Sequence, residues 1–287
     1  MTKLYGLVQA GGFCFELLGV TFGVRANRKA EIERIEARLP WGSRRRGVCS
    51  VERLYSFSFR PPNQEPGRRL FHLLYGDADI VARTENETDL FDAFESDIAL
   101  RAAQSSPKMF VIHAGVVSWE GQGIVIPGPS MAGKTTLVRE FVRRGGVYYS
   151  DEFAVLDSKG QAHPFPRALH IREGLGGKGE NVPLSMLQGK IGISPVPIKL
   201  ILLTKYEPLA QWRPRSVSLG RGALGLLANA FGGRANPSRA LSFVGAAVSG
   251  TTIMDGARGE ASDLVGKVLG DLGKGYGRRT RRAGRSS

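Results

Sequence analysis

The chain contains few of the residues that build disulfide frameworks and zinc sites. Among its 287 residues only Cys14 and Cys49 are cysteines, and four are histidines. The two cysteines form no C-x-x-C pair and have no histidine at metal-ligand spacing, so the sequence predicts no zinc site. Two cysteines also exclude a disulfide framework, and a reduced, cytoplasmic setting is the expectation that follows.

Long apolar runs are missing as well. No stretch approaches the roughly 18–20 apolar residues that a helix needs to cross a bilayer. The N-terminus shows no basic region followed by a long apolar core and a cleavage site. We therefore expect no membrane span and a cytoplasmic location.

Acidic residues are scarce relative to basic ones. The chain has 40 Lys and Arg against 26 Asp and Glu, a formal net charge of +14. This balance favours an acidic partner, nucleotide phosphates among them. Nucleic acid is not the expected partner. A nucleic-acid-binding protein should show a known module with a basic face and interleaved aromatic residues, and this sequence shows none. Residues 273–287 are rich in Gly, Arg and Ser and are predicted to form a basic disordered tail.

The pattern of apolar residues predicts two domains. Residues 1–106 contain short runs of aromatic and β-branched residues, which favour strands, so we expect a small β-rich N-terminal domain of unknown role. It should end with a helix from Asp89 to about Ala103, capped by Thr88. Residues 107–272 predict an α/β domain with a helix from Lys134 to Arg144 and with strands at 109–118, 124–127, 147–150, 153–156 and 198–204.

A complete G-x-x-x-x-G-K-[ST] motif, the Walker A pattern, lies between a strand-like and a helix-like run, which is the context of a phosphate-binding loop. Gly128 and Gly133 let the backbone approach phosphates, and the start of the helix adds N–H donors. Lys134 is predicted to contact the β- and γ-phosphates of ATP, and the Thr135 hydroxyl to bind Mg²⁺. The predicted nucleotide-binding residues are Gly128, Pro129, Ser130, Met131, Ala132, Gly133, Lys134, Thr135 and Thr136.

An acid pair, Asp151-Glu152, ends the strand that follows this helix. Ligands of open α/β sheets bind beyond the carboxyl ends of the strands. One acid can hold Mg²⁺ while the other accepts the proton of an attacking hydroxyl. In GTPase-type proteins the metal carboxylate comes much later in the chain, so the position of this pair favours a kinase that acts on an alcohol.

Several motifs occur in an order that resembles the catalytic domain of HPr kinase/phosphorylase, the bacterial serine kinase related to phosphoenolpyruvate carboxykinase. They are His113-Ala114-Gly115-Val116-Val117, the Gly121/Gly123 hairpin, the phosphate loop, Arg144-Gly145-Gly146, Tyr149-Ser150-Asp151-Glu152 and the run from Pro166 to Gly176. The resemblance covers roughly residues 108–205. The layout of the whole chain is similar to HPr-kinase-related proteins of biosynthetic clusters, including lasso-peptide kinases.

The resemblance implies a P-loop kinase core of the HPr kinase/phosphoenolpyruvate carboxykinase type. It implies ATP and Mg²⁺ as cofactors and a serine of a peptide or small protein as the phosphoryl acceptor. Asp151 would be the catalytic base, Glu152 would serve the metal together with Thr135, and His113 and Arg172 would act at the site. His170 stands where the family's signature has glutamate. Members of the family are often oligomeric, so a homo-oligomer is among the expectations.

Two other functions stay open at this point. Small-molecule kinases of the shikimate or gluconate type also place acids on the strand after the phosphate loop, but they begin near that loop, whereas here it starts at Gly128. A scaffold that binds ATP and transfers nothing is the other alternative, and the intact acid pair argues against it.

Overall fold

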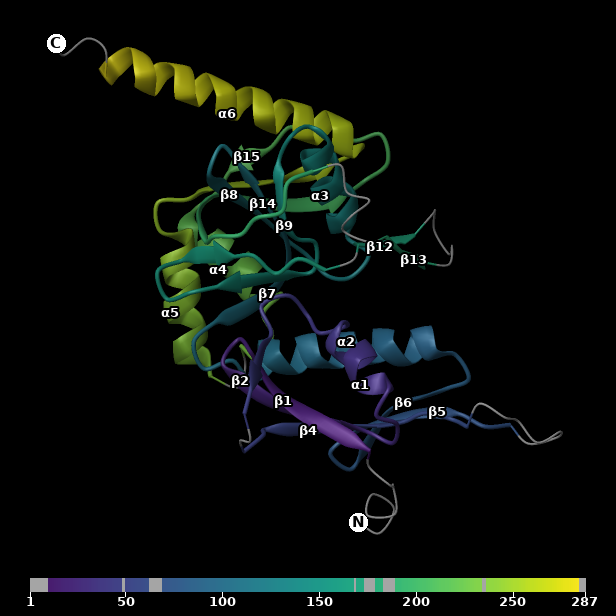
Figure 1. Ribbon diagram of the computed structural model, residues 1–287. Helices are drawn as coiled ribbons and strands as arrows, with labels where there is room; N and C mark the ends of the chain where they lie inside the picture. The colour runs from purple at the N-terminus through teal and green to yellow at the C-terminus, as the bar shows by residue number, and fades with distance from the viewer. Residues whose placement is uncertain are drawn as a thin grey trace. The chain divides into compact units, whose positions relative to one another are not determined.

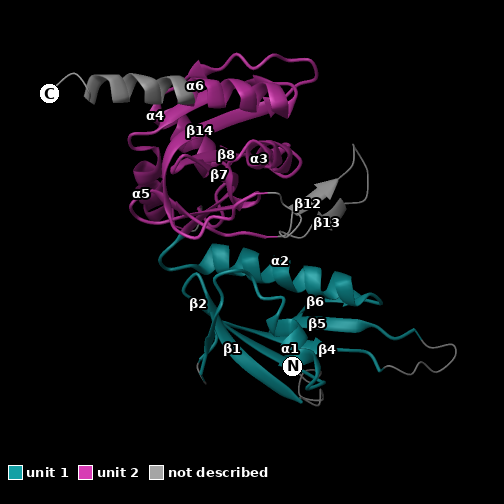
Figure 2. Ribbon diagram, turned by 45° about the horizontal axis from the view of Figure 1, so that its top comes forward, with its two compact units in different colours: residues 1–109 teal, residues 110–287 magenta. Residues whose placement is uncertain are grey.

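The chain divides into two compact units, residues 1–109 and residues 110–287 (Figures 1 and 2). A computed structural model describes residues 10–47, 50–61, 69–167, 169–172, 179–182, 189–233 and 236–283. Both units mix helices with a β-sheet. Within these ranges, no helix combines the length and the apolar character that a membrane span requires.

Unit 1 is built on a six-stranded sheet in the order β3-β1-β2-β4-β5-β6. The strands are β1 (Gly11–Leu17), β2 (Val20–Ala26), β3 (Arg44–Arg46), β4 (Arg53–Ser58), β5 (His72–Gly76) and β6 (Asp79–Thr84), and the helices are α1 (Glu31–Glu36) and α2 (Glu87–Ser105). Aromatic residues of the sheet pack on α2. The Phe94 ring meets those of Tyr55 and Phe57 edge to face, with centroids 5.2 and 4.8 Å apart. Such pairs stabilise beyond their buried area.

The helix predicted from Asp89 begins two residues earlier, and Thr88 is not its cap. The N-cap is Asn86, whose side-chain oxygen accepts a hydrogen bond of 2.9 Å from the backbone N–H of Thr88. Asparagine is among the most favourable N-cap residues, because its short side chain reaches the free N–H groups of the first turn.

Unit 2 is built on an eight-stranded sheet, ordered β11-β10-β7-β8-β14-β16-β15, with β9 paired to β7. Its strands are β7 (Phe110–Trp119), β8 (Gln122–Pro127), β9 (Val147–Ser150), β10 (Phe153–Leu156), β11 (Gln161–His163), β14 (Val196–Tyr206), β15 (Arg215–Ser216) and β16 (Thr252–Arg258). The central strands β8, β14 and β16 run parallel to one another. A separate hairpin pairs β12 (Leu169–Arg172) with β13 (Gly179–Val182).

Helices cover both faces of this sheet. They are α3 (Lys134–Arg143), α4 (Leu219–Leu227), α5 (Pro237–Val248) and α6 (Ala261–Ala283). Leu200 and Leu202 of β14 pack in one core cluster with residues of α3 and α6, whereas Ile201 packs in a second cluster with residues of α4 and α5. Successive side chains of a strand point to opposite faces, so β14 contributes to both cores.

The turn between β7 and β8 leads into the strand that precedes the predicted phosphate loop. Trp119 pairs with Gln122 across a two-residue turn, in which Glu120 and Gly121 have φ of 49° and 75°. Two left-handed residues are the signature of a type I′ hairpin, whose twist matches that of the strands. The predicted turn is therefore confirmed, and β8 runs from it to Pro127, directly before Gly128.

The C-terminal segment overlaps the basic tail predicted from residue 273. Helix α6 is assigned from Ala261 to Ala283. No proline interrupts residues 261–283, and arginine, lysine and leucine are good helix formers, so the glycines in this segment do not end the helix. Residues 284–287 of the predicted tail lie outside the described residues.

Candidate active site

The predicted phosphate loop is a tight turn between β8 and α3. Gly133 is the N-cap of α3 with φ of 78°, and Met131 also lies in the left-handed region with φ of 67°. The Gly128 N–H donates to the His113 carbonyl at 3.2 Å, which ties the start of the loop to β7. The first N–H groups of an α-helix have no partner inside the helix and form its positive end. The loop therefore ends on donors suited to an anion.

Lys134 folds back over this loop. Its side chain is 7% exposed, and Nζ donates to the Pro129 carbonyl at 2.8 Å. Burial lowers the pKa of the Lys134 ammonium, while the charges of Glu152 and Asp151 oppose that change. A buried cation thus lies against the backbone of the predicted phosphate site.

Asp151 joins the loop although it lies 16 residues farther along the chain. Thr135 Oγ1 donates to Asp151 Oδ2 at 2.9 Å, and the Tyr148 hydroxyl lies 3.1 Å from Asp151 Oδ1 and 3.1 Å from the Arg167 carbonyl. Asp151 is 6% exposed. Burial raises the pKa of its carboxyl group, and the hydrogen bonds from Thr135 and Tyr148 lower it in part. The net effect is a buried acid with a raised pKa at the end of β9.

Glu152 has a different environment from its neighbour. Its carboxylate accepts a hydrogen bond of 2.7 Å from Arg167 Nη1, and its side chain is 46% exposed. Arg167 also lies over the Phe153 ring, 5.3 Å from the centroid. The two acids of the pair are therefore not equivalent: one is buried under hydroxyl donors and the other is in an ion pair at the surface.

The donors at this site suit Mg²⁺. Thr135, Asp151 and Glu152 offer hydroxyl and carboxylate oxygens, the ligands that Mg²⁺ prefers. The Thr135 hydroxyl donates its hydrogen to Asp151, so its lone pairs stay available to a cation. Within the described part of the chain, no cluster of three or more His, Cys, Asp or Glu side chains could hold a metal alone.

His113 lies beside this cluster on β7. It is half-buried, its ring is 5.9 Å from that of Phe231, and its backbone pairs with Phe153 of β10. Burial and the nearby charge of Lys134 lower the pKa of its imidazole, and the charge of Glu152 opposes that change. The structure thus brings His113, Lys134, Thr135, Asp151 and Glu152 to one end of the sheet.

One predicted site residue is not placed. Arg172 belongs to β12, but its side chain lies outside the described residues. The sequence analysis missed three others, namely Tyr148, Arg167 and Arg258. Tyr148 precedes the acid pair by three residues and could have been noticed as a polar group on a buried strand. Arg258 carries no local signal, because it reaches the loop from 125 residues away.

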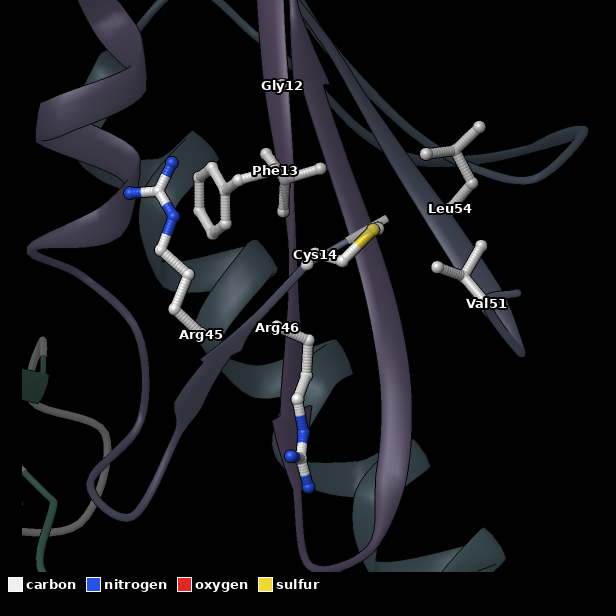
Figure 3. A pocket seen from close by; sticks show the side chains of 10 residues that line it. Gly12, Phe13, Cys14, Arg45, Arg46, Val51 and Leu54 are labelled. Carbon is white, nitrogen blue, oxygen red and sulfur yellow. The ribbon is translucent and has the colours of Figure 1, made fainter. Parts of the chain in front are cut away.

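A cleft of about 470 Å³ on unit 1 does not carry these features (Figure 3). Its lining includes Cys14, Arg45 and Arg46. Arg45 forms an ion pair with Glu36 and lies 5.0 Å from the centroid of the Phe13 ring, and Arg46 forms an ion pair with Glu16. Its arginines are thus already paired within the chain, and none of the predicted site residues lines it.

No protein-family model matches the chain, and no curated protein matches it. Among solved structures, the chain is similar to one described as the structure of the Hpr(Ser) kinase/phosphatase from Coxiella burnetii, with 12% sequence identity and a TM-score of 0.33 over 62% of this chain and 99% of that chain.

Proposed function

We propose that unit 2 is an ATP- and Mg²⁺-dependent kinase that transfers the γ-phosphoryl group to a serine hydroxyl of a peptide or small protein, such as the precursor peptide of a biosynthetic cluster. The observation that carries this proposal is the 2.9 Å hydrogen bond between Thr135 and Asp151. It joins the loop that would hold the phosphates to the acid that would accept the proton. The motif order described above supports the choice of a peptide or protein as the acceptor.

Each group has a role in holding the nucleotide. Lys134 and the free N–H groups at the start of α3 would bind the β- and γ-phosphates. Thr135 and Glu152 would hold Mg²⁺, which supplies positive charge to the transferring phosphoryl group. Arg167 holds the Glu152 side chain in an ion pair, with Nη1 2.7 Å from Oε2.

The proton of the acceptor hydroxyl would go to Asp151. As the serine oxygen forms its bond to the γ-phosphorus, the bond between that phosphorus and the oxygen of ADP breaks, and ADP leaves. A carboxylate accepts a proton more readily when its pKa is closer to the working pH, and burial moves Asp151 in that direction. His113 would act at the same end of the sheet, where burial lowers the pKa of its imidazole and favours the uncharged ring.

An incubation with γ-labelled ATP and Mg²⁺ tests the function. The candidate acceptors are the peptides encoded beside the gene and a panel of small polyols and sugars. Label in a peptide serine supports the proposal. Label in a small molecule would favour the small-molecule kinase, and tight ATP binding with no labelled product would favour the scaffold.

Tyr148→Phe should change the pH dependence of the rate. The variant loses a donor to the buried Asp151 carboxylate, so the pKa of Asp151 should rise further. On the acidic limb we expect kcat/KM to fall by up to about tenfold, the size of a lost hydrogen bond to a charged group, because more of Asp151 is protonated there. The acidic limb of the pH–rate profile should move to higher pH.

Tyr149→Phe is the matched control for this change. The Tyr149 hydroxyl donates to the Ser194 carbonyl at 2.8 Å and has no bond to the acid pair. Its pH–rate profile should coincide with that of the unmodified protein. Equal shifts in the two variants would show that Tyr148 acts only through packing.

A further inference from the structure

Arg258 is a buried cation without a carboxylate partner among the described residues. It ends β16, pairs in register with Tyr206 of β14 and is 3% exposed. Its guanidinium lies over the Tyr206 ring, 5.2 Å from the centroid. Its hydrogen-bond acceptors in the described part of the chain are backbone carbonyls, and its Nε has no partner there. A buried charge is costly unless other groups compensate it.

Two of these carbonyls belong to the phosphate loop. Arg258 Nη2 donates to the carbonyl oxygens of Ala132 at 3.2 Å and Gly133 at 3.3 Å, and Nη1 donates to that of Gly259 at 3.0 Å. A peptide unit is planar and trans, so its C=O and the following N–H point in opposite directions. By holding these two carbonyls, Arg258 sets the direction of the N–H groups of Gly133 and Lys134.

Gly133 makes room for this contact. A Cβ at position 133 would collide with the Arg258 guanidinium, and its φ of 78° is one that residues with side chains rarely adopt. The second glycine of the motif therefore has two reasons to be glycine in this chain: the φ of the turn and the space that Arg258 occupies. The Arg258 side chain on β16 is thus hydrogen-bonded directly to the backbone of the loop.

We propose that Arg258 is a positioning residue that aims the N–H groups of Gly133 and Lys134 at a polyphosphate. The bound anion would in turn offset the guanidinium charge. The inference rests on the proposed function only in that the loop binds a polyphosphate, and it needs no phosphoryl acceptor. It predicts that removal of the guanidinium impairs recognition of the phosphates rather than the rest of the nucleotide.

The experiment measures the binding of inorganic tripolyphosphate and ATP to the full chain. Arg258→Met and Arg258→Gln are compared with Arg215→Met, an exposed arginine that faces Asp255 from the neighbouring strand β15. We expect both Arg258 variants to bind tripolyphosphate at least about tenfold more weakly, as for the loss of hydrogen bonds from a charged group. The control should bind as the unmodified protein does. Arg258→Gln retains one donor group in case Arg258→Met does not fold.

A second readout separates positioning from a general structural role. In the unmodified protein, saturating tripolyphosphate should shift the amide proton resonances of Gly133 and Lys134 downfield. In the Arg258 variants these amide shifts should be smaller even at saturation. The substitution should lower the melting temperature of the ligand-free protein only slightly. It should remove a larger part of the increase in melting temperature that tripolyphosphate causes.

Three results would overturn the inference. They are an affinity within twofold of the unmodified protein in a folded Arg258 variant, unchanged amide shifts at saturation, and failure of the unmodified protein to bind tripolyphosphate. The proposed function fails on a different result, namely ATP binding without transfer to any acceptor. That outcome leaves the role of Arg258 intact.

Discussion

Asp151→Asn is expected to lower turnover by a factor on the order of 10² or more, the size of a lost general base. The amide keeps the shape of the side chain but cannot accept the proton of the acceptor hydroxyl. ATP affinity should stay within about threefold, because the phosphates are held by the loop and Lys134. Single-turnover rates and calorimetric ATP binding measure the two effects separately.

Asp157→Asn is the matched control for this substitution. Asp157 is also a hydrogen-bonded aspartate, but it lies after β10, and its side chain bonds to His163 at 2.9 Å and to the backbone N–H groups of Lys159 and Gln161. Its turnover should be that of the unmodified protein. Normal turnover in Asp151→Asn would show that another group is the base, and Glu152→Gln would then be the variant to compare.

Asp151→Asn should also change the free energy of unfolding by an amount that depends on pH. Burial raises the pKa of Asp151 above 3.8, so the folded state binds its proton more tightly than the unfolded state does. The tighter binding of this proton stabilises the folded state fully below about pH 3.8. That stabilisation is lost as the pH rises through the raised pKa of Asp151. Asparagine has no such titration.

Urea unfolding at a series of pH values measures this difference. The free energy of unfolding of Asp151→Asn, relative to the unmodified protein, should increase between pH 4 and pH 8. The Asp157 carboxyl has its pKa lowered, mainly by its hydrogen bonds to His163 and the backbone against the effect of burial, so Asp157→Asn should show the opposite trend. If the difference in unfolding free energy between Asp151→Asn and the unmodified protein did not vary with pH, burial would not raise the pKa of Asp151.

The elements around the loop could be predicted because their signals are local. The apolar spacing of Leu137, Val138 and Phe141 predicted the buried face of α3, and all three side chains are buried. Strand β9 coincides with the predicted range 147–150. The acid pair could be placed at a strand end because the turn that follows Ser150 is short. Each of these features depends on residues less than ten positions apart.

Other parts of unit 2 could not be predicted in this way. Helix α5 was missed because small and weakly apolar residues such as Gly245 and Ala246 blur its helical period. Strand β16 was missed because Asp255-Gly256 within it is typical of a turn, and only its pairing with β14 and β15 makes that segment extended. The place of Arg258 in the site follows from this pairing, which no local pattern reveals.

The environment of each acid also depended on the fold. Adjacent residues in a strand-like segment point in different directions, so Asp151 turns under Thr135 and Tyr148 while Glu152 reaches Arg167. The sequence predicted a division of roles between the two acids. It could not give the burial that separates their chemistry.

Lys134→Met should abolish transfer, with a loss on the order of 10³ or more, because it removes a charged donor from the transferring phosphoryl group. Methionine retains an apolar stem of similar length, so the packing of the buried side chain changes little. Unlike Asp151→Asn, this variant should also bind ATP much more weakly. The Pro129 carbonyl loses the Lys134 donor but keeps the hydrogen bond of 3.3 Å from the Ala132 N–H.

Lys159→Met is the control for this loss, because Lys159 is an exposed lysine in the turn between β10 and β11. It should retain both transfer and ATP affinity. Comparing the loss of ATP affinity with the loss of turnover then distinguishes the two roles. Lys134→Met should lose ATP affinity and turnover together, whereas Asp151→Asn should lose turnover alone. If Lys134→Met bound and transferred normally, the loop would not hold the phosphates, and the assignments of Thr135 and Asp151 would fail with it.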